Sequence, residues 1–255
     1  MGIGEGVSGA FTDILSEGVV LNAGAILMLM AGGLIHEVIP VGLLQCNCSV
    51  VGDPQTREAI VIDPGDEVER ILEAIERHKL VVKAIVNTHA HIDHVGGLQK
   101  MRQVTGAPVL MHREDLELYG SLEMQAAMIG VRVPAKAEVD GFLGEGETLR
   151  WGSWGAHVLH TPGHNKGSLC LYLPAKDGAA GQTEKPVLFA GDTLFAGSIG
   201  RTDLWGGSFR EIMRSLELKL LELPDETIVY PGHGPSTSIG RERTTNPFLI
   251  GEFWH

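Results

Sequence analysis

The chain has 255 residues, 44% hydrophobic and 20% charged, which fits one large domain with a full hydrophobic core. Its formal net charge of −12 argues against a nucleic-acid partner, because neutralising phosphates requires a basic surface. The 3 cysteines are too few to predict a disulfide framework.

The first 33 residues are predicted to be an extension outside the domain, which then covers residues 34–255. The run 19–35 is almost entirely apolar, but glycines interrupt it and it is short for a membrane span. A secretory signal needs positive charge near the N-terminus, whereas the first Lys or Arg is Arg57. We expect a cytoplasmic protein with no membrane partner; a membrane-associated segment is the alternative for this run. Alternative start residues are Met28 and Met30.

Strands and helices alternate along the first half of the domain. Alternating or β-branched apolar residues predict strands at 35–39, 45–51, 59–63, 81–87 and 108–111. Helical spacing of apolar residues predicts helices at 67–78, 95–104 and 113–132.

The second half repeats this mixture. Strands are predicted at 148–151, 156–161, 168–173, 186–190 and 227–230, with a surface hairpin loop at 176–185. Helices are predicted at 209–221 and 239–246. Two β-rich halves, each with helices, predict an α+β fold in which two sheets pack face to face with helices outside.

The stretch Thr88–Gly97 carries four metal-competent side chains within six positions. His89, His91 and Asp93 alternate at every second residue, so an extended segment would direct them to one side. His94 breaks the alternation and would point toward a second centre. The stretch follows a predicted strand and is therefore expected on a loop at its carboxyl end, where open α/β folds place their chemistry.

Three further ligand candidates stand at predicted strand ends, each after a glycine that frees the backbone: His164, Asp192 and His233. Any one of them alone would be an ordinary strand-end residue. Together with the dense cluster they indicate a metal centre, since imidazole and carboxylate suit zinc as well as iron or manganese.

This ligand pattern resembles the metallo-β-lactamase superfamily over residues 34–249. Four segments resemble its short glyoxalase II-like hydrolases: Gln45–Cys48, Gly191–Phe195, Gly200–Leu204 and Gly232–Thr237. The resemblance implies an αββα sandwich, which agrees with the predicted order of elements.

The resemblance also implies two divalent metal ions, with zinc expected and iron or manganese as alternatives. The first ion would be bound by His89, His91 and His164, and the second by Asp93, His94 and His233. Asp192 would bridge them together with a hydroxide, and Asp93 and Asp192 are the expected catalytic carboxylates.

The implied reaction is hydrolysis of a small-molecule thioester, S-(2-hydroxyacyl)glutathione, such as S-lactoylglutathione. A thiol of pKa about 8.5 leaves as thiolate without a proton donor, and no dedicated acid stands beside the ligands. The alternatives are a mononuclear iron persulfide dioxygenase and a lactonase or β-lactamase. A diiron oxygen-reducing protein would have Glu in place of His91.

Substrate contacts are expected from Arg201, Lys166 and Arg241. Longer glyoxalase II enzymes bind glutathione with a basic C-terminal domain and with a Lys and a Tyr, near which this chain has Arg201 and Asp203. Glutathione specificity is therefore less well supported than thioester hydrolysis. Asp63 is expected to orient a metal-binding histidine, since such histidines usually donate their other N–H to a carboxylate.

Overall fold

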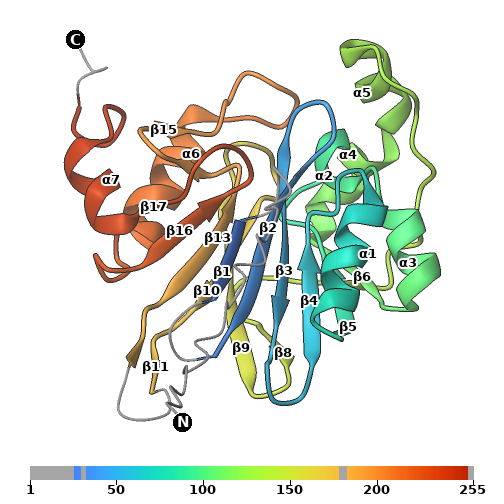
Figure 1. Cartoon of the computed structure of the whole chain (residues 1–255). Helices are drawn as coiled ribbons and strands as arrows, with labels where there is room; N and C mark the ends of the chain where they lie inside the picture. The colour runs from blue at the N-terminus through green and yellow to red at the C-terminus, as the bar shows by residue number, and fades with distance from the viewer. Residues whose placement is uncertain (1–25, 30–32, 178–182, 252–255) are drawn as a thin grey trace, which may run out of the picture.

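The computed structural model describes residues 26–29, 33–177 and 183–251. Two β-sheets pack face to face, with one group of helices outside each sheet (Figure 1). The predicted αββα sandwich is confirmed.

The first sheet has seven strands in sequence order. They are β1 (Ile26–Leu29), β2 (Ile35–Val41), β3 (Cys46–Gly52), β4 (Glu58–Ile62), β5 (Val81–Val86), β6 (Val109–Met111) and β7 (Gly141–Phe142). Pairs from β1 to β4 are antiparallel, and pairs from β4 to β7 are parallel. The helices of this half are α1 (Val68–Arg77), α2 (Ile92–Val95), α3 (Leu98–Thr105), α4 (Leu116–Gly120) and α5 (Leu122–Ile129).

The second sheet has six strands in the order β17-β16-β13-β10-β9-β8. Their bounds are β8 (Thr148–Trp151), β9 (Trp154–His160), β10 (Leu169–Leu173), β13 (Val187–Gly191), β16 (Ile228–Pro231) and β17 (Thr237–Ser238). Two hairpins stand apart: β11 (Lys176–Asp177) with β12 (Thr183–Glu184), and β14 (Leu194–Phe195) with β15 (Ser198–Ile199). The helices are α6 (Phe209–Ser215), the π-helical turn Leu216–Leu220 and α7 (Ile239–Thr245).

The core has three parts, which correspond to the layers. One lies between the sheets and contains Ile60, Trp151 and Phe189. The others fill the space between each sheet and its helices. Both faces of the central strands are therefore buried, which explains their continuous apolar runs. In α1, Ile71 and Ile75 are buried at the spacing that predicted this helix.

Two predicted helices are divided in the structure. The expected helix 95–104 is preceded by the separate short helix α2, and α3 begins only at Leu98, after two glycines. The expected helix 113–132 consists of a 3₁₀ turn (Arg113–Asp115), α4 and α5, with Ser121 between the two α-helices. Local turn geometry interrupts a pattern that apolar spacing alone predicts as continuous.

One strand lies ahead of the expected domain boundary at residue 34. Ile26–Leu29 pair antiparallel with β2 and add an edge strand to the first sheet. Met28, an expected alternative start, lies in this strand, whereas Met30 and residues 1–25 lie outside the described residues. Within the described chain, none of the helices has the length and apolar character needed to cross a bilayer.

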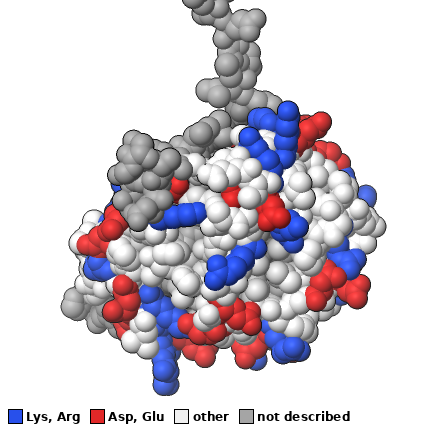
Figure 2. All heavy atoms as spheres, turned by 90° about the horizontal axis from the view of Figure 1, so that it is seen from below, with Lys and Arg blue, Asp and Glu red and all other residues white. Residues whose placement is uncertain are grey.

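Charged side chains of both signs are interspersed on the face seen from below in Figure 2. On the described part of that face, Lys and Arg form no continuous field of the kind a long anionic polymer requires.

Candidate metal centre

All seven predicted ligands come together at one end of the sandwich. His89 and His91 follow β5, whereas Asp93 and His94 belong to α2. The other three follow strands of the second sheet: His164 after β9, Asp192 after β13 and His233 after β16. Both sheets therefore contribute donors to one place.

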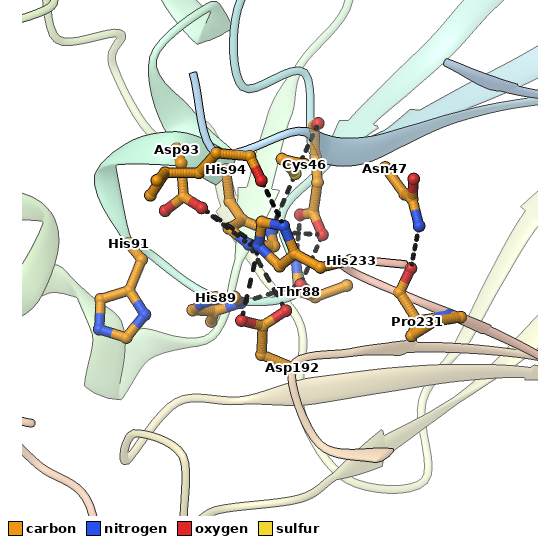
Figure 3. A network of polar contacts seen from close by, with 12 residues as sticks. Cys46, Asn47, Thr88, His89, His91, Asp93, His94, Asp192, Pro231 and His233 are labelled. Carbon is orange, nitrogen blue, oxygen red and sulfur yellow. Dashed lines mark hydrogen bonds and ion pairs between the residues drawn. The ribbon is translucent and has the colours of Figure 1, made fainter. Parts of the chain in front are cut away.

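The donors form the two predicted triads. One contains His89, His91 and His164, the other Asp93, His94 and His233, and within each the donor atoms lie within 4.8 Å of one another. Asp192 groups with His89 and His94, one member of each triad. Figure 3 shows Asp93, His94, Asp192 and His233 converging on a common point.

The distances fit metal ligands. His164 Nε2 lies 2.8 Å from His91 Nδ1, and His233 Nε2 lies 3.2 Å from both His94 Nε2 and Asp93 Oδ2. Two nitrogens bound to one tetrahedral zinc at 2.0–2.1 Å would be separated by about 3.3 Å. Asp192 places Oδ1 3.6 Å from His94 Nε2 and Oδ2 3.6 Å from His164 Nε2, between the triads.

Two donor atoms at this point are buried and have no hydrogen-bond partner: His89 Nε2 and Asp192 Oδ1. Buried polar atoms in folded proteins nearly always have a partner, so these two atoms fit a bound cation. Three carboxylates surround His94, those of Asp63, Asp93 and Asp192. The negative charge of these three carboxylates also stabilises a cation that binds between them.

The extended geometry expected for His89, His91 and Asp93 is wrong. His91 is extended (φ −68°, ψ 147°), but the chain turns into α2 at Ile92. Asp93 and His94 therefore project from a helical turn, which directs both into the second triad.

The electrostatics differ between the triads. Burial holds the pKa of His89 well below its ordinary value and lowers that of His91 to about 3, so both rings are neutral, as metal binding requires. Burial also opposes charge on His94, but Cys46, Asp192 and Asp93 outweigh it and hold the pKa of His94 well above its ordinary value. The second triad is thus a place where positive charge is stabilised.

Comparison with known proteins identifies the family. Residues 41–233 match the sequence profile described as "Metallo-beta-lactamase superfamily". The chain belongs to this superfamily.

Several superfamily relatives match nearly their whole length. A protein of Aquifex aeolicus named "Uncharacterized protein" is 45% identical over 84% of this chain and 97% of its own. "Hydroxyacylglutathione hydrolase GloC" of Haemophilus influenzae is 38% identical, again over 84% of this chain and 97% of its own. The name of the Haemophilus influenzae relative confirms the predicted resemblance to the glyoxalase II-like type.

Three solved structures share the fold. The BLEG-1 B3 metallo-beta-lactamase has a TM-score of 0.74 at 38% identity, covering 85% of this chain and 100% of its own. TTHA1623, solved in a di-iron-bound form, has a TM-score of 0.72 at 39% identity, covering 83% and 99%. ETHE1 from Myxococcus xanthus has a TM-score of 0.68 at 29% identity, covering 85% of each chain.

Three of the candidate metal-binding histidines have a polar partner at Nδ1, the ring nitrogen that faces away from the other donors. His94 Nδ1 lies 3.1 Å from Asp63 Oδ2, the contact that the role expected for Asp63 requires. His164 Nδ1 lies 2.8 Å from the carbonyl oxygen of Arg201, and His233 Nδ1 lies 3.0 Å from that of Leu44. Such partners fix the ring and its tautomer, so that Nε2 faces the point on which the donors converge.

Two residues that the sequence did not single out hold the ligand loops. The Asp115 carboxylate accepts hydrogen bonds from Ala90 N (2.7 Å) and Gly167 N (3.0 Å), and so joins the loops of His89 and His164. Gln125 Oε1 accepts from Ile92 N at 2.9 Å, at the start of α2. Their partners lie 25 to 52 residues away, so no local spacing could have indicated them.

Backbone contact positions α2. A Cβ on Gly65 would lie 1.6 Å from the carbonyl oxygen of Asp93, and one on Gly97 would lie 2.4 Å from that of Pro64. Gly97 N also donates to Pro64 O at 2.9 Å. The loop after β4 and the ends of α2 therefore pack without side chains between them.

The expected substrate contacts are less well placed. Arg201 is held by Asp203 through two hydrogen bonds of 2.8 Å. Lys166 lines a small depression with Trp205, and Arg241 lies in the first turn of α7. None of the three lines the cavity beside Asp93.

Proposed function

We propose that the protein is a dinuclear metal-dependent hydrolase of thioesters, of the S-(2-hydroxyacyl)glutathione class. The observation that carries the proposal is the complete donor set, in which two triads flank the Asp192 carboxylate. The relative named hydroxyacylglutathione hydrolase, at 38% identity, supports the substrate class.

His89, His91 and His164 would hold one ion, Asp93, His94 and His233 the other, with Asp192 between them. Two divalent ions bound there supply a polarised substrate carbonyl and a water of lowered pKa. Zinc suits the donors, and iron or manganese are the alternatives.

The chain's own residues then serve to orient and to exclude solvent. Asp63 and the carbonyl oxygens of Arg201 and Leu44 fix three of the rings, so little reorganisation is required during reaction. His89 and His94 are fully buried beneath the centre, which leaves the substrate to approach from the side of Asp93 and His233.

The leaving group favours a thioester. A thiolate of pKa about 8.5 departs without a proton, whereas a lactam nitrogen requires an acid or an equivalent metal contact. The residues lining the cavity beside Asp93 include two other ionisable groups, Asp66 and Arg132. Asp66 Oδ1 accepts a hydrogen bond from Glu67 N at 2.7 Å, and neither residue belongs to the donor set.

The likeness to a B3 metallo-beta-lactamase, at 38% identity, favours β-lactam hydrolysis as a second candidate. The likeness to ETHE1 is lower, at 29%. A mononuclear persulfide dioxygenase would not need the second triad, and that triad is present here.

One set of assays tests the proposal. Protein loaded with zinc, iron or manganese is given S-D-lactoylglutathione, a cephalosporin, or glutathione persulfide with oxygen, and metal content is measured alongside. We expect release of thiol from the thioester with two ions per chain. Oxygen uptake with one iron per chain, or turnover of the cephalosporin alone, would refute thioester hydrolysis.

A further inference from the structure

A cavity of about 260 Å³ opens beside the metal ligand Asp93. It lies between the turn that joins β2 to β3 and the segment that follows α5. Both rise at the upper end of the molecule in Figure 1, near α2. Complete pockets for small molecules measure roughly 300–1,000 Å³, so this cavity accommodates one end of a substrate.

The walls of this cavity are largely apolar. Leu43 and Leu44 come from the β2–β3 turn and are 75% and 47% exposed. Ile129, the last residue of α5, and Val133, in the segment after it, line the same cavity and are also exposed. Large apolar side chains gathered in the open next to a reaction centre indicate a surface that a ligand covers.

Arg132 lies on the same cavity and is exposed. Within the described chain, its guanidinium has no hydrogen bond or ion pair, whereas Arg201 and Arg102 are both held by carboxylates. Asp66 also lines the cavity, and its Oδ1 accepts from Glu67 N at 2.7 Å. Arg132 is thus a cation on the cavity that Asp93 also lines, with its planar donors free.

We propose that Arg132 binds a carboxylate of the substrate, while the apolar stem that links this carboxylate to the thioester lies against Leu43 and Leu44. A guanidinium matches a carboxylate with two parallel hydrogen bonds. The carboxylate comes either from the thiol carrier or from the far end of the acyl group. The inference rests on the proposed function and replaces Arg201, Lys166 and Arg241 as the anion-binding residue.

Binding of non-hydrolysable thioethers tests the inference without relying on turnover. Isothermal titration calorimetry on the metal-loaded full chain compares three ligands: S-hexylglutathione, with carboxylates in the carrier; S-(5-carboxypentyl)-N-acetylcysteamine, with one at the far end; and S-hexyl-N-acetylcysteamine, with none. The variants are Arg132→Gln and Arg132→Lys. The matched control is Arg150→Gln, an exposed arginine on β8, which contributes nothing to the cavity.

We expect Arg132→Gln to weaken one carboxylate ligand about 10- to 100-fold and to leave the neutral ligand unchanged. Arg132→Lys should retain part of the affinity, and Arg150→Gln all of it. The ligand that is affected identifies the source of the carboxylate.

Equal binding of both carboxylate ligands by wild type and Arg132→Gln would overturn the inference, as would failure of wild type to bind any of the three. Arg132-dependent binding without thioester hydrolysis would retain this site and refute the proposed function. Thioester hydrolysis together with binding that does not depend on Arg132 would support the proposed function and refute this site.

Discussion

Asp192 has the position on which the candidate centre most depends. Its two oxygens face different triads, at 3.6 Å from His94 Nε2 and 3.6 Å from His164 Nε2. Its Oδ1 is buried without a hydrogen-bond partner. A neutral side chain of the same shape would retain the packing but remove the charge that two cations would share.

We therefore predict that Asp192→Asn lowers metal content from two ions per chain to one or fewer, as measured by elemental analysis. Hydrolysis of the preferred substrate should fall at least about 100-fold, because removing a residue that only orients a metal ligand already costs about 10- to 100-fold in metal affinity or activity. Glu73→Gln, on the exposed side of α1, is the control and should behave as wild type. Full metal content in the Asp192 variant would refute the bridging role.

His36 shows how a buried imidazole away from the centre makes stability depend on pH. It lies in β2, is 0% exposed, bonds Ser49 Oγ at 3.1 Å and packs edge-on against Phe189 and Tyr230. Burial lowers the pKa of His36 to about 3, from an ordinary value of 6.5. The unfolded chain therefore takes up a proton at this residue at a higher pH than the folded chain does.

Above pH 6.5 the ring of His36 is neutral in both the folded and the unfolded chain, so it does not reduce the free energy of unfolding. As the pH falls from 6.5 toward 3, protonation of the unfolded chain alone lowers that free energy. In metal-free protein, wild type should lose about 2 kcal/mol more unfolding free energy than His36→Phe between pH 7.5 and pH 5. Urea titrations at the two pH values measure this. His157→Phe, an exposed substitution on β9, should keep the wild-type dependence. Parallel curves for wild type and His36→Phe would contradict the assignment.

At the scale of elements, the position of α2 depends on glycines. Gly65 leaves room for the carbonyl oxygen of Asp93, and Gly97 for that of Pro64. Because α2 carries Asp93 and His94, any shift of this helix displaces two ligands of the second triad.

Gly65→Ala should therefore displace α2, weaken metal binding and lower the free energy of unfolding by about 1–3 kcal/mol. Gly120→Ala is the matched control, because a Cβ there meets nothing within 4 Å at the end of α4. That change should be neutral or slightly stabilising, since alanine is the better helix former. Thermal denaturation and a competitive metal titration distinguish the two; equal behaviour would show that the contact at Gly65 is unimportant.

The elements that the sequence predicted well are those with a repeating pattern. The strands before the ligands are β-branched runs, and α1 repeats apolar residues at helical spacing. Helix α2 has only four residues and thus no measurable period, so His89, His91 and Asp93 were expected to lie in an extended segment. Asp115 and Gln125 contact the ligand loops only through the tertiary fold, and no local signal marks them.

At the scale of the whole molecule, the candidate centre joins the two halves of the sandwich. His89 follows a strand of the first sheet, whereas Asp192 and His233 follow strands of the second. A cation bound by both sets links segments more than 100 residues apart along the chain. Metal binding should therefore stabilise the packing of the sheets as well as the ligand loops.

Removal of metal by a chelator should lower the thermal midpoint and the free energy of unfolding. Saturation at about 1,000 times the dissociation constant contributes roughly 4 kcal/mol per site. Scanning calorimetry with and without chelator measures the change, and Asp192→Asn should respond less than wild type. A midpoint that does not depend on chelator would show that the sheets are held by their apolar core alone.

The β2–β3 turn both lines the cavity and contacts the ring of His233. The side chains of Leu43 and Leu44 form a wall of the cavity, while the carbonyl oxygen of Leu44 accepts from the ring of His233. The carbonyl belongs to the main chain and remains whatever side chain is attached. Substitutions at these two positions can therefore change which substrates fit, while the orientation of the metal ligand stays the same. The range of substrates can thus be altered at this turn without rebuilding the centre.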